Sequence, residues 1–495
     1  MNKGPFSLSA LKILTMREAQ KKPPPSQLRL PPLELPPPPA HPCDAGALRV
    51  GFLWTSTYDS EFANNLITMF ETMVPMCVET EKGCGRPRSA GAQRERQLEA
   101  DASIQMWWFS VNDDGDDEAG EYKARKRARQ VFGERFVVLQ SGEQRPDHTG
   151  YHEGVDTAMQ IRRHNLHMLF NLPGWLNEMT MSISGAQPAV MQVAFKGYPG
   201  TLGAQFVQHL ISDAISSPPE YAAAGYTERM VYMPHTYYPV GNYATWKREG
   251  GNGSRGRDAR SRGPGLQRKH YALPPSGTVY GAFNDHYKID PSIFRTWMRI
   301  LKDDVSAHAN SSISSGEGGN PSVLWALKHG AEDMLPKVAK KYKVQSARLI
   351  FSSFFPKTQH LSIKALSDIF LDTPLYNAHS TASDMLWAQV PVLTLPREKM
   401  AGRAAASIVA AGGMGIGIAR NEDDYRQLAP RLARSTRRLR QPGRALSREE
   451  LARSYLFDEK VFAAAMLRCL RLLAEAHRLA VDVYRGRQFH ILVAA

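Results

Sequence analysis

Residues Leu371–Trp387 read LDTPLYNAHSTASDMLW, and the change of pattern within them decides the fold. An apolar strand-like run, DIFLDT, leads into a turn rich in Pro, Asn and His, and a helix-like run ending in MLW follows. Thr381 and Asp384 show the S/T-x-x-D pattern of a capping box, which predicts that a helix begins there. A loop between a parallel strand and a helix N-terminus is also where α/β proteins bind phosphate. The stretch therefore fits a capped helix alone or an anion site.

Strand-like and helix-like segments alternate along the rest of the chain. The strand-like runs are ALRVGFLW, SIQMWWFSV, ERFVVLQ, LHMLFNL and AVMQVAF in the first half, then TVYGAFN, SVLWAL, ARLIFSS, DIFLDT and PVLTL in the second. This alternation predicts right-handed βαβ units and mostly parallel sheets. The two series predict an α/β protein with two Rossmann-like domains facing each other across a cleft.

The length of 495 residues also favours more than one domain, because one hydrophobic core seldom covers so long a chain. We predict a disordered Pro-rich leader at 1–46 and an N-terminal Rossmann-like domain at 47–247. A Gly/Arg-rich insert or linker at 248–274 and a C-terminal Rossmann-like domain at 275–485 follow.

Composition narrows the class of protein. The chain is 42% hydrophobic and 22% charged, with a mean hydropathy of −0.38, and no apolar run approaches the roughly 20 residues that span a bilayer. Its four cysteines show no metal-site spacing and are too few for a disulfide framework. The N-terminal residues lack a continuous apolar core followed by a small-residue cleavage site, which disfavours secretion, although weak organelle targeting stays open. We therefore expect an intracellular protein without a membrane partner.

The net charge of +14 would suit nucleic acid, an acidic protein or a phosphorylated ligand. Many of the basic residues fall in Arg248–His270 and Arg431–Ser454, outside the apolar periodic segments and without interleaved aromatic residues. We interpret them as solvated loops and a solvated helix face, and we do not expect nucleic acid as the main partner.

Two more strand ends carry positive charge. Lys357 follows the strand-like ARLIFSS, and Lys288 follows TVYGAFN before a helix start at Asp290. Because the carboxyl ends of parallel strands share one edge of a sheet, Lys288, Lys357 and the turn at His379 should lie at the same rim. Two cations and a helix start there predict a diphosphate site that needs no metal.

Common catalytic motifs are missing. The chain has no GK[ST] loop, HExxH or GxSxG, and its GGMGIG lacks the order of a dinucleotide fingerprint. These absences disfavour P-loop kinases, zinc proteases and serine hydrolases. The GYPG turn at 197–200 indicates a tight turn after a strand.

Several stretches together resemble a known family. KGYPGT, YTERMVYMPHTYY, FNDHYKIDPSIFRTWMRIL, FSSFFPKTQH and LDTPLYNAHSTASDMLWAQVPVLTLPREKMAGRAAAS are similar, in order and spacing, to the catalytic region of the nucleocytoplasmic protein O-GlcNAc transferases. The resemblance implies a GT-B glycosyltransferase of the cytoplasm and nucleus. Such an enzyme moves GlcNAc from UDP-GlcNAc to Ser/Thr hydroxyls of intracellular proteins, with inversion and without a cofactor or metal. The family's helical repeat array is missing from this chain.

The resemblance also implies roles for residues of the C-terminal domain, which would hold the nucleotide sugar. Lys288 would stabilise the UDP leaving group with Tyr287 beside it, and Asp384 would anchor the ribose. The remaining implied contacts are Lys357 and His360 at the uridine end, and His379, Ser380 and Thr381 at the diphosphate.

In the N-terminal domain, which would face the acceptor, His167 matches an active-site histidine of the family. The GYPGT loop of the family matches Tyr198, Pro199, Gly200 and Thr201.

Three departures from the family pattern stand out. Glu61 and Asn64-Asn65 occupy the place of two histidines, which makes Glu61 the candidate general base. Asp285 replaces a neutral glutamine that helps bind the nucleotide. An expected arginine after His360 is absent, and Lys364 is the nearest substitute.

Other functions stay open from the sequence. A protein O-fucosyltransferase using GDP-fucose shares the framework. A nucleotide-sugar-binding pseudoenzyme or scaffold would explain Glu61 and Asp285, and a weaker alternative is an RNA-associated protein that uses the Arg/Gly insert.

Overall fold

The computed structural model describes residues 47–55, 61–82, 104–111, 123–140, 151–248, 267–312, 321–328, 330–353, 357–439, 448–482 and 491–493. The chain divides into two compact units. The described residues up to Gly241 and from Glu459 onward form the first unit, and Asn242–Asp458 form the second.

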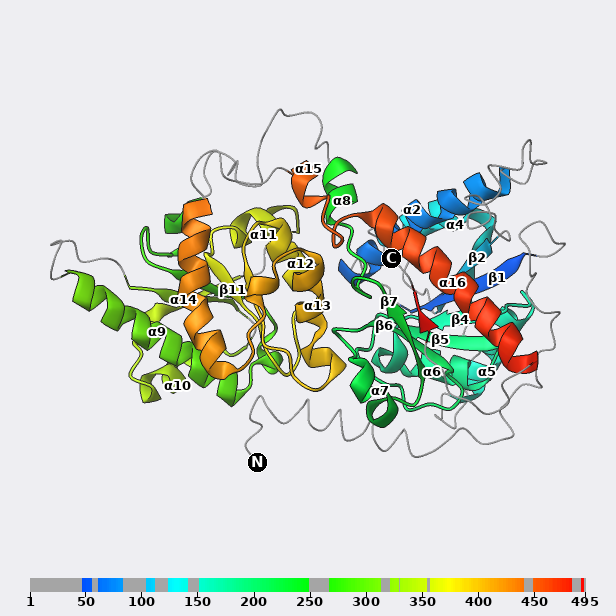
Figure 1. Cartoon of the computed structure of the whole chain (residues 1–495), viewed down its shortest axis with the longest axis horizontal. Helices are drawn as coiled ribbons and strands as arrows, with labels where there is room; N and C mark the ends of the chain where they lie inside the picture. Colours follow the sequence, from blue (N-terminus) through cyan, green and yellow to red (C-terminus); the bar gives the residue numbers. More distant parts are fainter. Residues whose placement is uncertain are drawn as a thin grey trace. The chain divides into compact units, whose positions relative to one another are not determined.

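The first unit is built on an eight-stranded sheet in the order β13-β7-β6-β5-β4-β1-β2-β3, and every neighbouring pair is parallel (Figure 1). Its strands are β1 (Leu48–Trp54), β2 (Ile104–Val111), β3 (Phe136–Leu139), β4 (Met168–Asn171), β5 (Met191–Phe195), β6 (His209–Asp213), β7 (Arg229–Met233) and β13 (Ile491–Leu492). Its α-helices are α2 (Glu61–Lys82), α4 (Lys123–Phe132), α5 (Tyr151–Arg162), α6 (Glu178–Gly185), α7 (Pro219–Gly225) and α16 (Glu459–Asp482).

Helix α4 shows why a strongly basic segment can still pack. Ala124, Ala128 and Phe132 recur every fourth residue and are buried, so one face of the helix is apolar while the basic residues take the others. The Phe132 ring lies 5.2 Å from the ring of Phe70 on α2. Phe70 in turn packs 4.5 Å from Phe52 on β1, which ties both helices to the sheet.

The second unit is built on a five-stranded parallel sheet in the order β10-β9-β8-β11-β12. Its strands are β8 (Val279–Ala282), β9 (Val323–Leu327), β10 (Leu349–Ser352), β11 (Ile369–Leu371) and β12 (Val392–Leu393). Its α-helices are α8 (Asn242–Arg248), α9 (Pro291–Ser312), α10 (Leu335–Lys341), α11 (Lys357–Lys364), α12 (Ser380–Trp387), α13 (Ala404–Ala411), α14 (Glu422–Leu439) and α15 (Arg448–Leu451). The prediction of parallel α/β domains is confirmed.

The division of the chain differs from the predicted boundaries at both ends of the second unit. Helix α16 falls inside the predicted domain 275–485, yet it packs against α2 and β7 of the first unit (Figure 1). Its apolar face, which includes Met466, Leu470 and Leu473, is buried there. Helix α8 was assigned to the N-terminal domain but belongs to the second unit, where the Tyr243 ring lies 6.3 Å from Trp387.

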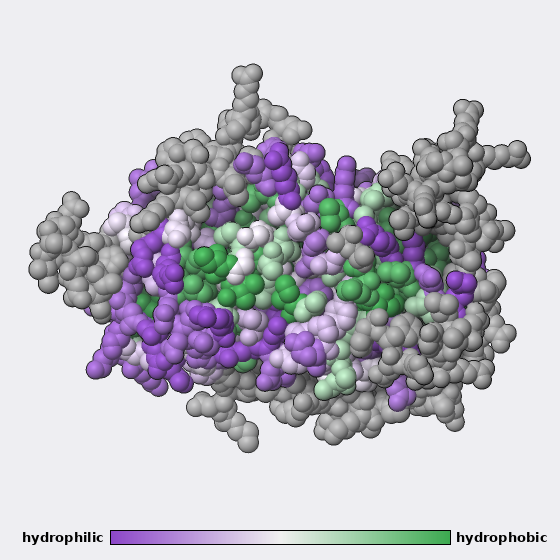
Figure 2. Space-filling model, in the orientation of Figure 1, coloured by the Kyte–Doolittle hydropathy of each residue, from purple (hydrophilic) through white to green (hydrophobic). Residues whose placement is uncertain are grey.

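Part of the basic run Arg431–Ser454 lies on α14. Leu432, Ala433 and Thr436 are buried, whereas Arg431 and Arg434 are exposed. Figure 2 shows a largely hydrophilic surface over α9, α10 and α14. This part of the run therefore forms the solvated helix face that the sequence predicts.

The leader predicted at 1–46 lies outside the described residues, as do residues 249–266 of the Gly/Arg-rich insert predicted at 248–274. The described ends of that insert belong to the second unit, where Arg248 ends α8 and Arg268 Nη2 donates to Asp368 Oδ2 at 2.8 Å. Among the helices that the structure describes, none is both long and apolar enough to cross a membrane.

Candidate functional site

The candidate site lies at the carboxyl edge of the second sheet. Strands β8 and β11 are neighbours, with Tyr280 paired to Ile369, so the turn His286–Lys288 after β8 and the start of α12 after β11 leave the sheet side by side. Strand β9 lies between β10 and β8, so the end of β10, which precedes α11, lies about 10 Å from the end of β8 along this edge. The predicted strand ends therefore share one rim, although they are not all adjacent.

The loop after β11 is held by the buried carboxylate of Asp372. One carboxylate oxygen accepts hydrogen bonds from Asn284 Nδ2 at 3.0 Å and from the Ala378 amide at 2.7 Å, and the other accepts from Thr394 Oγ1 at 2.8 Å. Burial raises the pKa of Asp372 to about 6, against the effect of these hydrogen bonds. The carboxylate thus ties together three segments beneath the site.

Asn377 fixes the second half of the same loop. Its Nδ2 donates to the Thr373 carbonyl at 2.9 Å, its Oδ1 accepts from the Ala405 amide at 3.2 Å, and its own amide donates to the Ala401 carbonyl at 2.8 Å. The side chain is completely buried. Helix α12 therefore begins from a rigid platform.

Lys288 brings the positive charge. Its Nζ lies 4.2 Å from the centre of the Tyr376 ring and 5.8 Å from that of Tyr287. Burial lowers the pKa of Lys288, while the carboxylates of Asp285 and Asp372 act in the opposite direction. A partly desolvated ammonium at a strand end interacts with an anion more strongly than one in water does.

Helix α12 starts differently from the prediction. The helix begins at Ser380 with His379 as N-cap, and the His379 side chain makes no capping hydrogen bond, so the predicted capping box of Thr381 and Asp384 is wrong. Thr381 lies inside the first turn, and Asp384 Oδ1 accepts a hydrogen bond from Asn242 Nδ2 at 3.0 Å instead. The first turn contains no acidic residue. Its dipole can therefore favour an external anion.

His379 links this helix start to Lys288. Its Nδ1 lies 3.1 Å from the Asn377 carbonyl oxygen, which can only accept, so Nδ1 carries the proton. The His379 ring lies 5.8 Å from the Tyr376 ring, which also contacts Lys288. The Tyr376 and His379 rings thus form a continuous contact from the Lys288 ammonium to the N-terminus of α12.

Asp384 and Lys364 form a buried pair behind the first turn. Lys364 Nζ lies 3.9 Å from Asp384 Oδ2, and the two residues are 3% and 7% exposed. Lys364, the predicted substitute for the missing arginine, therefore reaches the proposed ribose anchor.

In the first unit, the GYPGT loop follows β5 at the carboxyl edge of that sheet. The Gly197 amide donates to the Leu172 carbonyl at 2.9 Å, and a Cβ at Gly197 would lie 2.2 Å from that oxygen. Glu228 accepts from Thr201 Oγ1 at 2.7 Å and from the Leu202 amide at 2.6 Å. No signal in the sequence identified Glu228 as the support of this loop.

His167 does not lie with the GYPGT loop. It immediately precedes β4, at the amino edge of the sheet, and its Nδ1 accepts from the Arg49 amide at 3.0 Å. The loop follows the carboxyl end of the neighbouring β5. The structure therefore gives His167 a role in joining β1 to β4 and separates it from the predicted acceptor site.

The residues in place of the two family histidines also have structural contacts. Asn64 Oδ1 accepts from Arg127 Nη1 at 2.9 Å, and Asn65 Oδ1 accepts from the Gly241 amide at 3.0 Å. Glu61 is the first residue of α2, which follows the carboxyl end of β1, and its side chain lies outside the description.

Comparison with known proteins decides the family. The sequence profile of the family described as "Glycosyl transferase family 41" matches residues 135–249 and 254–466. The chain belongs to glycosyl transferase family 41. Both units of this family 41 chain contribute to the match, including the GYPGT loop and the rim around Lys288.

Two relatives carry the name of a UDP-N-acetylglucosamine–peptide N-acetylglucosaminyltransferase. The probable enzyme SEC of Arabidopsis thaliana is 35% identical over 279 residues, which cover 56% of this chain and 26% of the relative. The Caenorhabditis elegans enzyme is 26% identical over 374 residues, covering 56% and 31% of the two chains. The family 41 chain thus spans about a quarter to a third of these relatives.

A solved structure supports the fold of this family 41 chain. The O-GlcNAc transferase of Thermobaculum terrenum superposes with a TM-score of 0.63 at 21% identity, covering 96% of this chain and 75% of that one. This likeness confirms the GT-B type of fold that the family resemblance implies.

The other predicted donor-site residues are placed less fully. Lys357 and His360 lie in the first turns of α11, but their side chains are outside the description. Asp285 precedes the turn that carries Lys288, and its carbonyl accepts from the Lys288 amide at 3.0 Å. Among the described residues, no group of three or more His, Cys, Asp or Glu could hold a metal ion.

Proposed function

We propose that this family 41 chain is an inverting glycosyltransferase that moves GlcNAc from UDP-GlcNAc to Ser/Thr hydroxyls of proteins. The observation that carries the proposal is the partly buried Lys288 beside the start of α12, whose first turn has no acid and no side-chain cap. The names of the two relatives support the choice of donor and acceptor.

The proposed reaction places the developing charge at the rim of the second sheet. As the bond from the anomeric carbon to the UDP oxygen breaks, negative charge grows on the diphosphate. Lys288 and the amides of Ser380 and Thr381 would stabilise that charge without moving, because the loop beneath them is fixed. One such preorganised donor typically contributes about 100-fold to 1,000-fold in rate.

The nucleoside would lie further along the same edge. Asp384 would accept from the ribose hydroxyls, and Lys364 would hold that carboxylate in position. Lys357 and His360 would contact the uridine end, with Tyr287 beside the diphosphate and His379 at the helix start. Tyr198, Pro199, Gly200 and Thr201 would form the acceptor side of the first unit.

Removal of the acceptor proton is assigned to Glu61. A carboxylate can act as general base when its pKa suits the task, and the position at the start of α2 after β1 supports this choice. Charge neutralisation by Lys288 would make a metal unnecessary. The acceptors would be intracellular proteins of the cytoplasm and nucleus, with no nucleic acid needed.

A second candidate function is a nucleotide-sugar-binding scaffold. It is favoured by Asp285. The carboxylate of Asp285 raises the pKa of Lys288, and its negative charge would weaken the attraction between this rim and a diphosphate. Binding without transfer would identify this alternative.

The decisive test supplies radiolabelled UDP-GlcNAc and GDP-fucose separately and follows hydrolysis and transfer to peptide. We expect transfer from UDP-GlcNAc, and loss of transfer in Lys288→Met but not in the control Lys337→Met, which removes an exposed lysine of α10. Preference for GDP-fucose would make the chain a fucosyltransferase. UDP-GlcNAc binding without any transfer would make it a scaffold.

A further inference from the structure

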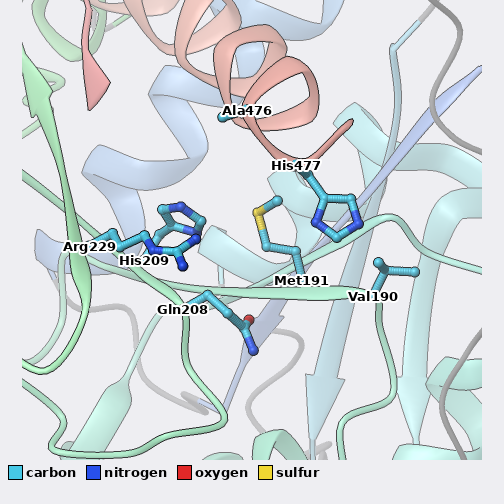
Figure 3. A pocket seen from close by; sticks show the side chains of 7 residues that line it. All are labelled: Val190, Met191, Gln208, His209, Arg229, Ala476 and His477. Atoms are coloured by element: carbon cyan, nitrogen blue, oxygen red, sulfur yellow. The ribbon is translucent and has the colours of Figure 1, made fainter. Parts of the chain in front are cut away.

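A pocket lies in the first unit, at the amino edge of its sheet. Met191, His209 and Arg229 are the first residues of β5, β6 and β7, and together with Gln208 and with Ala476 and His477 of α16 they line a cavity of about 230 Å³ (Figure 3). The GYPGT loop follows the opposite edge of the same sheet. The cavity is therefore separate from the proposed acceptor side.

The most unusual group in this pocket is His209. Its side chain is 3% exposed, and neither Nδ1 nor Nε2 has a hydrogen-bond partner. Buried polar side chains are hydrogen-bonded in the large majority of cases, and those that are not often await a ligand, ion or water. Even a neutral imidazole offers one N–H donor to such a ligand.

Arg229 is the cation among the residues that line the pocket, because burial lowers the pKa of His477. Arg229 and His477 line the same pocket, and no acidic residue is among its lining residues. Burial, followed by the effects of Arg229 and then His477, lowers the pKa of His209 to about 3. A cation would be repelled by Arg229, whereas an anion would be attracted by it and would ease protonation of either histidine.

We propose that this pocket binds the phosphoryl group of a small phosphate monoester or of inorganic phosphate. Arg229 suits the fork geometry of phosphate oxygens, and His209 and His477 add donors for a dianion. Met191 and Ala476 line the pocket with apolar surface that would contact the organic part of an ester. Val190, Gln208 and His477 are only partly buried, so the cavity opens to solvent.

The test measures the thermal unfolding midpoint with inorganic phosphate, glycerol phosphate or acetate, all in the Lys288→Met background to weaken the donor site. We expect a saturable rise in Tm with phosphate and with glycerol phosphate, and a much smaller rise with acetate. A larger rise with glycerol phosphate identifies an ester as the preferred ligand, and equal rises identify free phosphate as sufficient.

Variants of the lining residues test whether the phosphate-dependent rise in Tm comes from this pocket. His209→Leu should raise the midpoint without ligand, because a buried group with no partner is removed, and should also abolish the phosphate-dependent rise. Arg229→Met should abolish that rise, whereas Arg163→Met, which removes an exposed arginine of the same unit, should keep it. The proposal is overturned by an unchanged rise in His209→Leu and Arg229→Met, or by no rise at all in the parent.

Discussion

The two units differ in how they accommodate departures from the family pattern. In the second unit the expected arginine is absent, yet Lys364 brings a cation within 3.9 Å of Asp384. In the first unit Glu61 and Asn64-Asn65 occupy the place of two expected histidines, and Asn65 Oδ1 accepts from the Gly241 amide. The proposed donor side thus has a cation where the family pattern has an arginine, whereas the proposed acceptor side has a carboxylate and amides where that pattern has histidines.

The sharpest test of that comparison is Glu61→Gln. If Glu61 is the general base of the acceptor side, kcat should fall by about 100-fold to 10,000-fold with little change in UDP-GlcNAc binding, because the proton acceptor is lost and the donor site is untouched. Glu178→Gln is the matched control, since Glu178 is the first residue of α6 in the same unit.

A kcat that is unchanged in Glu61→Gln would remove the carboxylate from the mechanism. The acceptor proton would then have to pass to another group. The replacement of the two histidines would in that case not mark a change of general base.

The pair in the second unit predicts the next largest effect. Lys364→Met leaves the Asp384 carboxylate buried without its cation, and removal of one partner from a buried pair costs about 3–5 kcal/mol of stability. Donor binding should weaken as well, because the carboxylate loses its fixed position. Chemical unfolding and calorimetry with UDP would measure the two effects.

The double variant Lys364→Met/Asp384→Asn sharpens this prediction. The amide carries no charge, so much of the lost stability should return while donor binding stays weak. A double variant as unstable as Lys364→Met would show that the contact of the Lys364 ammonium with the Phe283 ring, 5.8 Å from its centre, matters more than the ion pair.

The sequence predicts the fold and the rim of the donor site because both depend on local patterns. Alternating apolar runs indicate parallel strands, and the carboxyl ends of such strands share an edge, which brings Lys288 and the start of α12 together. The amphipathic pattern of α16 shows that one face is buried but not against which unit. The same limit applies to Glu228 and Asp372, whose partners are distant in the sequence.

The capping box failed for a different reason. Thr381 and Asp384 have the right spacing, but Asp384 accepts from Asn242 on α8 and pairs with Lys364. Tertiary contacts therefore decided the role of a residue whose local pattern indicated a cap.

His209, at the amino edge of the first sheet, should make the stability of the first unit depend on pH. Its pKa is lowered from 6.5 to about 3, so the unfolded chain takes up the proton at a higher pH than the folded chain does. The free energy of unfolding is therefore highest above pH 6.5 and falls as the pH decreases toward 3. Without phosphate, the stability advantage of His209→Leu over the parent should grow by about 2 kcal/mol between pH 7 and pH 5. Urea unfolding at both pH values measures this difference, and an advantage that does not change with pH would mean that His209 is not the titrating group.

The smallest effect on activity is expected for His167, a variant of which separates structural from catalytic roles in the first unit. His167→Leu removes the acceptor for the Arg49 amide at the start of β1, and loss of such a hydrogen bond costs about 1–3 kcal/mol. Transfer activity should stay at the level of the parent at temperatures where both proteins are folded, because the residue lies at the amino edge of β4 while the GYPGT loop follows the carboxyl end of β5. Unfolding curves and kcat measured together make the distinction. A large loss of kcat with an unchanged unfolding curve would return His167 to the acceptor site. The acceptor side would then keep one histidine of the family pattern, contrary to the difference between the two units.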